Sequence, residues 1–256
     1  MLSVDLNCDL GEGYGAWQLG HDAALLEIVS SANVACGFHA GDPNIMRDVC
    51  RVAAANGVTI GAQVSYHDRV GFGRRFIDIE SDDLTNDVIY QIGALSAFAS
   101  AAGSRVAYVK PHGALYHAVN AHPHQAAAVA AAIRIADSTL AVLCMDDSEF
   151  ARAAKAEGLH AVREAYADRV YESDGRLRSR RAHGAVIASP DGAIAQARSI
   201  VTRRSVNLWN GGTCSVLADS ICVHGDTPGA VDLARAVRQG LEDAGVSIEP
   251  FVPSGL

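Results

Sequence analysis

The sequence predicts an α/β fold in which parallel strands alternate with helices and close into a barrel. Short apolar runs alternate with longer stretches of helical period along the whole chain, as in repeated strand–helix units. The runs do not alternate apolar with polar residues, which is typical of strands buried on both faces. Polar residues follow many of these runs, where a barrel would gather them at one mouth. An open doubly wound sheet, which would spread them along one edge, is the alternative.

The expected strands are short and apolar. Seven or eight strand–helix units are enough to close a barrel, and right-handed crossovers would make the strands parallel. The eight runs are residues 2–6, 33–36, 58–64, 106–109, 140–144, 160–165, 221–223 and 246–248.

Four of the expected helices carry start signals, and three of these also carry a stop signal. A side chain that caps free backbone N–H groups, followed by proline, begins a helix, and glycine ends one. These signals bracket helices at Asp42-Pro43 to Gly57, Ser81 to Gly103, Ser189-Pro190 onward, and Thr227-Pro228 to Gly245. Two long segments without such signals, 65–78 and 165–184, are expected to be loops over the mouth.

Composition limits the class of protein. With 256 residues, 49% of them hydrophobic, the chain suits one large domain spanning residues 1–256. The formal net charge of −8 argues against a surface for nucleic acid or for anionic membranes, and no run approaches the roughly 18 apolar residues of a membrane span. Six scattered cysteines without a C-x-x-C pair, and no signal-peptide pattern, indicate reduced thiols in a cytoplasmic protein.

The first candidate site is the segment DLNCDLGEG, which begins at Asp5. Asp5, Asn7 and Asp9 stand at every second position, which puts their side chains on one face of a strand. Glu12 follows between two glycines. A single carboxylate here would often be a helix cap or a satisfied core acid, but three acids and an amide together favour a functional site.

Three histidines next to glycines form the second group of candidates. His39 lies between two glycines, and His112 and His224 are each followed directly by one. Little can pack around such side chains, which favours a role as general base or ligand. Asp42 is expected to be a helix N-cap. The three histidines and Asp9 could also coordinate a divalent metal, although no H-x-x-x-H or H-E-x-x-H spacing supports this.

Lys110 ends the apolar run VAYVK and is one of only two lysines. At the end of a buried strand it would be partly desolvated, and could hold a carboxylate or phosphate or act with a lowered pKa. No G-x-x-x-x-G-K-[ST] loop and no G-x-S-x-G elbow occur in the sequence, which excludes a Walker-type ATP site and disfavours a serine hydrolase. Further polar residues after the expected strands are Gln63, Glu164, Asp168, Arg169 and Asp226.

At these motifs the chain resembles the LamB/YcsF family, whose members form the A subunit of bacterial 5-oxoprolinase. The resemblance rests on DLNCDLGEGYGAW, SANVACGFHAGDP, GFGRR, VKPHGALYH, EAYADRVY, the L-x-x-R of Leu177 and Arg180, and CVHGD. It implies a seven-stranded parallel β/α barrel resembling that of sugar deacetylases. It further implies a reaction in which 5-oxo-L-proline, ATP and water give L-glutamate, ADP and phosphate. Two partner subunits, B and C, are then required, and ATP would be bound mainly by them.

One position departs from the family pattern. Many members read GAHP-S-Y/F-P-D where this chain reads GAQVSYHD, so Gln63 stands in place of a histidine. Glutamine donates and accepts hydrogen bonds but cannot act as a base. Either that histidine is dispensable, or His67 takes its role.

The implied reaction needs a cation for the substrate carboxylate and phosphate, a base for water, and an acid for the lactam nitrogen. Asp9 or His39 would activate water, and His112 or His224 would give the proton. The alternatives are a binding subunit without chemistry of its own, and a stand-alone metal-dependent amide or sugar deacetylase. The expected catalytic residues are Asp9, Glu12, His39, Lys110, His112 and His224, and the expected substrate contacts are Asn7, Gln63, Arg74, Arg75, Glu164, Asp168, Arg169, Arg180 and Asp226.

Overall fold

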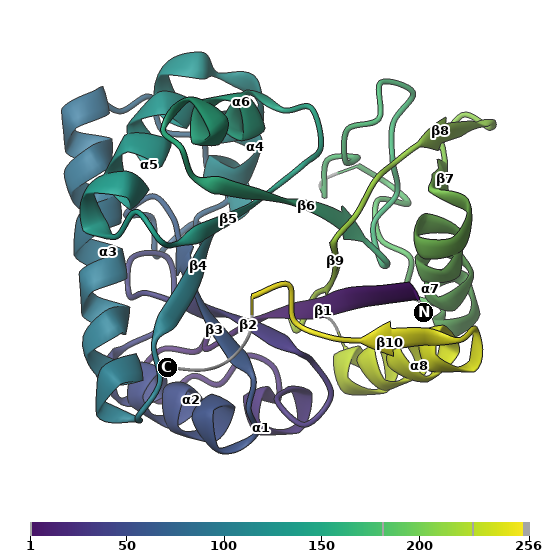
Figure 1. Ribbon diagram of the computed structural model, residues 1–256, viewed down its shortest axis with the longest axis horizontal. Helices are drawn as coiled ribbons and strands as arrows, with labels where there is room; N and C mark the ends of the chain where they lie inside the picture. The colour runs from purple at the N-terminus through teal and green to yellow at the C-terminus, as the bar shows by residue number, and fades with distance from the viewer. Residues whose placement is uncertain (1, 181, 227, 253–256) are drawn as a thin grey trace.

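The computed structural model describes residues 2–180, 182–226 and 228–252, and its centre is a closed barrel of seven parallel strands (Figure 1). The strand order is β1-β2-β3-β4-β5-β6-β9, and β9 pairs with β1 to close the ring. A further strand, β10, runs parallel to the start of β1 outside the closure. The strands are β1 (Leu2–Leu10), β2 (Ser31–Ala35), β3 (Thr59–Val64), β4 (Val106–Pro111), β5 (Ala141–Cys144), β6 (His160–Tyr166), β9 (Ser220–Val223) and β10 (Val246–Ile248).

Helices cover the outside of the barrel, with α2 and α3 on one side and α7 and α8 on the opposite side (Figure 1). A short antiparallel hairpin, β7 (Ser205–Asn207) with β8 (Thr213–Ser215), stands apart from the barrel. The helices are α1 (Asp22–Leu25), α2 (Pro43–Ala55), α3 (Ser81–Ala101), α4 (Gly113–Ala121), α5 (Pro123–Ala136), α6 (Glu149–Ala156), α7 (Pro190–Arg198), the π-helical turn η1 (Ser199–Arg203) and α8 (Ala230–Asp243). In the described part of the chain, none of them is long and apolar enough to cross a membrane.

The predicted barrel is confirmed, and the open-sheet alternative is wrong because β9 pairs with β1. Each of the eight expected apolar runs overlaps a strand. The first strand extends to Leu10 rather than ending at residue 6, since its pairing with β2 continues to Leu10. Asp42 caps α2 by accepting hydrogen bonds from the backbone of Asn44 and Ile45. The predicted start signal at Thr227 lies outside the described residues.

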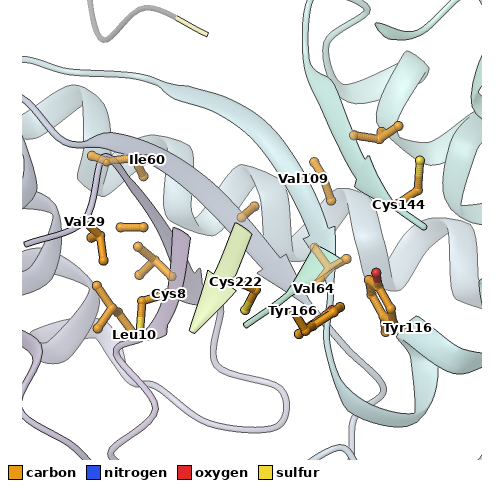
Figure 2. Close-up of a cluster of buried hydrophobic side chains, with 14 of the residues drawn as sticks. Cys8, Leu10, Val29, Ile60, Val64, Val109, Tyr116, Cys144, Tyr166 and Cys222 are labelled. Carbon is orange, nitrogen blue, oxygen red and sulfur yellow. The ribbon is translucent and has the colours of Figure 1, made fainter. Parts of the chain in front are cut away.

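Alternation along β1 separates a polar barrel interior from an apolar outer layer. Asp5, Asn7 and Asp9 lie on one face of the strand, as predicted. They point into the barrel and are bonded to side chains of other strands. Cys8 and Leu10 point the other way and belong to the hydrophobic cluster in Figure 2. Because successive side chains of a strand face opposite sides, one segment builds both the core and the site.

The end of the described chain lies under the N-terminal ends of the strands. The Phe251 ring contacts the Tyr108 ring edge-on at 5.0 Å between centroids, and the Thr59 hydroxyl donates to the carbonyl oxygen of Val252 at 3.1 Å. The opposite end, where the strands finish and the long loops begin, is the mouth.

Candidate active site at the barrel mouth

A buried ion network fills the upper interior of the barrel around Lys110. The ammonium Nζ lies 2.7 Å from Oε1 of Glu164 and 3.2 Å from Oδ1 of Asp9. It also donates to Asn7 Oδ1 at 3.2 Å and to the Cys222 thiol at 3.1 Å. Each donor of the ammonium therefore has a partner within the protein, and the lysine neutralises acids from two other strands.

This network changes what Lys110 and Asp9 can do. Burial alone would lower the pKa of Lys110, but Asp9, Cys222 and Glu164 outweigh it and hold that pKa well above its usual value. The expectation of a lowered lysine pKa is thus wrong. Burial would raise the pKa of Asp9, yet the nearby charge of Lys110 holds it well below its usual range. Asp9 is a permanent anion, which makes it a weak proton acceptor.

Glu12 differs from Asp9 although both carboxylates come from the same segment. Burial raises the pKa of Glu12 to about 7, with a further contribution from the charge of Asp9. Two acids whose surroundings separate their pKa values are a recurrent feature of acid–base sites. Glu12 is therefore the carboxylate suited to exchange a proton at neutral pH.

Two stacked imidazoles lie beside Glu12. The rings of His39 and His112 are 4.1 Å apart between centroids and nearly parallel. Burial lowers the pKa of both, that of His39 to about 4, so both rings are neutral at neutral pH. Glu12, His39 and His112 each place one donor atom within 4.8 Å of the other two. A carboxylate and two imidazoles are donors of the kind that a divalent metal ion takes.

A second histidine site, His224 with Asp168, lies at the rim. Nδ1 of His224 is 2.9 Å from Oδ2 of Asp168, which also accepts the backbone N–H of His224 at 3.0 Å. Burial would raise the pKa of Asp168, but its contacts with His224 lower it. The carboxylate orients the ring and leaves Nε2 as the atom that can take or give a proton. The ring of Tyr166 stacks on His224 at 5.5 Å and its hydroxyl donates to Glu164 at 2.8 Å, which links the rim to the interior network.

Two arginines from the long loops meet at Asp226. Arg180 lies 3.2 Å from the Asp226 carboxylate and Arg74 is paired with the same group. Burial would raise the pKa of Asp226, but Arg180, His224 and Arg74 lower it to about 2. The predicted position of the two loops is supported by these contacts, and by the bond from His112 Nε2 to the Phe72 carbonyl at 3.1 Å. The guanidinium groups are the exposed cations of the site, with 37% and 22% of the Arg74 and Arg180 side chains exposed.

Three other residues are engaged elsewhere. Arg75 is paired with Asp68 inside its own loop, at 3.0 Å from Nε to Oδ1. Arg169 donates to the backbone carbonyls of Ala185 and Arg178 and is buried. His67 is exposed and stacks on Phe38 at 4.7 Å, so it does not take the place that Gln63 occupies.

Several members of the interior network were missed from the sequence. Asn33 donates to Asn7 Oδ1 at 2.7 Å and to Asp9 Oδ1 at 2.9 Å, and accepts from the Tyr108 hydroxyl at 2.7 Å. The Cys222 thiol and the Tyr166 hydroxyl extend the same network. Asn33 and Cys222 lie inside apolar strand runs and Tyr166 directly follows one, and inward-facing period-two positions were the only signal that could have singled them out.

The closed barrel of parallel strands is a fold that this chain shares with solved deacetylase structures. The T48 deacetylase has the same fold, at 13% identity and a TM-score of 0.51 with 98% of this chain and 94% of that chain covered.

The chain belongs to the LamB/YcsF family, whose model matches residues 4–254. It is 57% identical to the A subunit of 5-oxoprolinase from Mycolicibacterium paratuberculosis over 251 residues, which cover 98% of this chain and 100% of that protein. The crystal structure of the lactam utilization protein from Thermus thermophilus superimposes with a TM-score of 0.93 at 42% identity. That comparison covers 98% of this chain and 100% of the other.

Proposed function

We propose that this chain is the A subunit of an ATP-dependent 5-oxoprolinase and that its barrel mouth opens the lactam ring of 5-oxo-L-proline. The observation that carries the proposal is the full-length similarity to proteins named as the A subunit of 5-oxoprolinase. The mouth supports it, because it combines exposed cations for an anionic substrate with two kinds of proton-exchanging group.

The substrate carboxylate binds Arg74 and Arg180, which face the solvent side of the site and share Asp226 as their present partner. Two guanidinium groups match a carboxylate well because each offers parallel N–H donors. Lys110 is not the carboxylate site, since its ammonium is already bonded to Glu164 and Asp9.

A lactam is a poor electrophile because amide resonance resists attack, and ATP overcomes this. The amide oxygen takes the terminal phosphoryl group and ADP leaves. A water molecule, deprotonated by Glu12, adds to the activated carbon. The C–N bond then breaks as His224 gives a proton to the nitrogen, which leaves an acyl phosphate. A second water molecule hydrolyses the acyl phosphate to L-glutamate and phosphate. Asp168 orients His224 throughout.

ATP is bound mainly by partner subunits B and C, because the sequence carries no Walker-type phosphate loop. The present chain then supplies the lactam site and the proton transfers. A binding role without chemistry is the competing form of this proposal. It is favoured by the full pairing of the interior charges, which leaves few groups free to react.

The test is an assay of ATP-dependent glutamate formation from 5-oxoproline by this chain alone, by the two partner subunits alone, and by all three together. We expect turnover only with all three. Activity of the two partners without this chain would refute the proposal. Full activity of a complex that contains both Glu12→Gln and His224→Gln would leave only the binding role.

A further inference from the structure

The side-chain amide of Gln63 lies between the three groups that could hold a metal ion. Its Nε2 is 3.0 Å from Oε1 of Glu12 and 3.0 Å from Nδ1 of His112. Its Oε1 is 3.2 Å from Nε2 of His39. One carboxamide thus contacts all three donors, and Gln63 itself is fully buried.

The positions of the hydrogen atoms in this group can be assigned from one contact. The Phe72 carbonyl can only accept, so Nε2 of His112, 3.1 Å away, carries a hydrogen. Neutral His112 then has a bare Nδ1, which needs a donor, and the Gln63 amide nitrogen supplies it. The second amide hydrogen goes to Glu12. Gln63 Oε1 is left as an acceptor, so the facing Nε2 of His39 carries a hydrogen.

We propose that the Gln63 carboxamide takes the place of a metal ion in this chain, joining Glu12, His39 and His112 by hydrogen bonds and holding both imidazoles in the Nε2–H tautomer. Gln63 is a positioning residue in this arrangement. The inference does not depend on which reaction the mouth performs.

The three donors are of the right kind for an ion, and their spacing is close to what one requires. Donors about 2.1 Å from a tetrahedral ion lie about 3.4 Å from one another. Glu12 Oε1 is 3.3 Å from His112 Nδ1 and 3.9 Å from His39 Nε2. The Gln63 amide nitrogen contacts both Glu12 Oε1 and His112 Nδ1 at 3.0 Å, however, and an amide N–H is a donor that cannot ligate a cation. The three donor groups therefore fit a metal ion, whereas the Gln63 amide nitrogen that contacts two of them does not.

The same assignment of hydrogen atoms leaves Nδ1 of His39 without a hydrogen. Nδ1 of His39 is buried and has no hydrogen-bond partner among the described residues. Since Gln63 fixes the hydrogen on Nε2, the free lone pair of His39 is on Nδ1. A buried, unpartnered acceptor costs free energy.

Metal content tests whether the Gln63 carboxamide takes the place of a metal ion. The full chain and the Gln63→Ala variant are equilibrated with Zn²⁺ or Co²⁺, desalted and analysed for bound metal, with the visible spectrum of Co²⁺ as a second readout. Removing the carboxamide frees one carboxylate and two imidazoles, a set that binds Zn²⁺ with water as fourth ligand. We expect Gln63→Ala to retain at least about 10-fold more metal than the wild type, as expected when a ligand set is released from an internal hydrogen-bond partner. Gln125→Ala is the control, since Gln125 is a buried amide that bonds to Tyr66 and Ile77.

Two results would overturn the proposed replacement of a metal ion by Gln63. One is a wild-type chain that keeps a stoichiometric ion which His112→Ala loses. The other is Gln63→Ala that folds and retains no more metal than the wild type.

Nitrogen NMR of the wild-type chain tests the proposed tautomers of His39 and His112 without any variant at position 63. With ¹⁵N-labelled histidine, His39 and His112 should each show a protonated Nε2 and an unprotonated Nδ1, assigned by loss of signals in His39→Ala and His112→Ala. An Nδ1–H signal from either ring would refute the tautomer assignment. Neither measurement uses turnover, so failure here and failure of the proposed ring opening are distinguishable.

Discussion

The barrel interior and the barrel rim contain similar residues but use them differently. In the interior, Lys110 is bonded to Glu164 and Asp9, and all three side chains are almost completely buried. At the rim, Arg74 and Arg180 share one carboxylate and remain partly exposed. Charges that already have buried partners hold the fold and set the electrostatic potential, whereas charges with exposed donors can exchange a protein partner for a ligand.

The same contrast separates the acid–base groups. Asp9 is ionised because Lys110 stabilises its anion, while burial without a lysine partner raises the pKa of Glu12 to about 7. Position in the barrel therefore decides which carboxylate can take a proton. Substitutions of interior groups should then act on stability, and substitutions of rim groups should act on turnover.

The largest effect is expected for Lys110→Met, which should destabilise the chain by about 3–5 kcal/mol, the usual cost of leaving buried charges without their partner. Asp9 and Glu164 would then repel each other inside the barrel. Urea unfolding of the isolated chain measures the loss directly.

Lys155→Met is the matched control, because Lys155 is the other lysine and is exposed on α6. It should change stability by less than about 0.5 kcal/mol. If Lys110→Met were as stable as the control but inactive in the complex, Lys110 would belong with the rim groups and the contrast would fail.

The next effect is on turnover. His224→Gln should lower kcat of the reconstituted complex by about 100-fold, the usual scale of one general acid or base. Its melting temperature should stay close to that of the wild type, since the glutamine amide can still donate a hydrogen bond to Asp168.

His160→Gln is the comparison for this variant, because His160 is exposed at the N-terminal end of β6, away from the mouth. It should keep full turnover. A His224→Gln complex with normal kcat and a raised KM would make His224 a substrate contact rather than the proton donor.

Some of the site follows from local sequence patterns. Asp5, Asn7 and Asp9 could be placed on one face because strand alternation needs no knowledge of the rest of the chain. The histidines could be placed at the mouth because each follows an apolar run and has glycine within two residues. Both inferences use neighbouring residues only, and the structure bears out the arrangement they describe.

Other features depend on partners that the sequence does not place. The pKa direction of Lys110 was predicted wrongly because burial was visible in VAYVK, but the acids on β1 and β6 that reverse it were not. Arg74 and Arg75 are adjacent, yet one reaches Asp226 across the mouth and the other turns back to Asp68. That difference arises from the conformation of one loop, for which no periodic pattern exists.

The smallest effect concerns Asp5, an interior acid without a lysine. Burial raises its pKa to about 6 from 3.8, although Ser220, Ser31 and Ser30 donate to it. Below about pH 4 the group is neutral in both the folded and the unfolded chain. Between the two pKa values only the unfolded chain is ionised, so the stability due to Asp5 declines as pH rises and is lost above about pH 6.

Asp5→Asn has no such titration. The free energy of unfolding of the wild type relative to this variant should therefore fall by about 2 kcal/mol between about pH 4 and pH 7, measured by urea unfolding at several pH values. A flat difference would mean that the three serines offset the cost of burying the anion. Hydroxyl groups would then be enough to keep an interior acid charged. A lysine partner would no longer be required to explain why interior carboxylates are ionised.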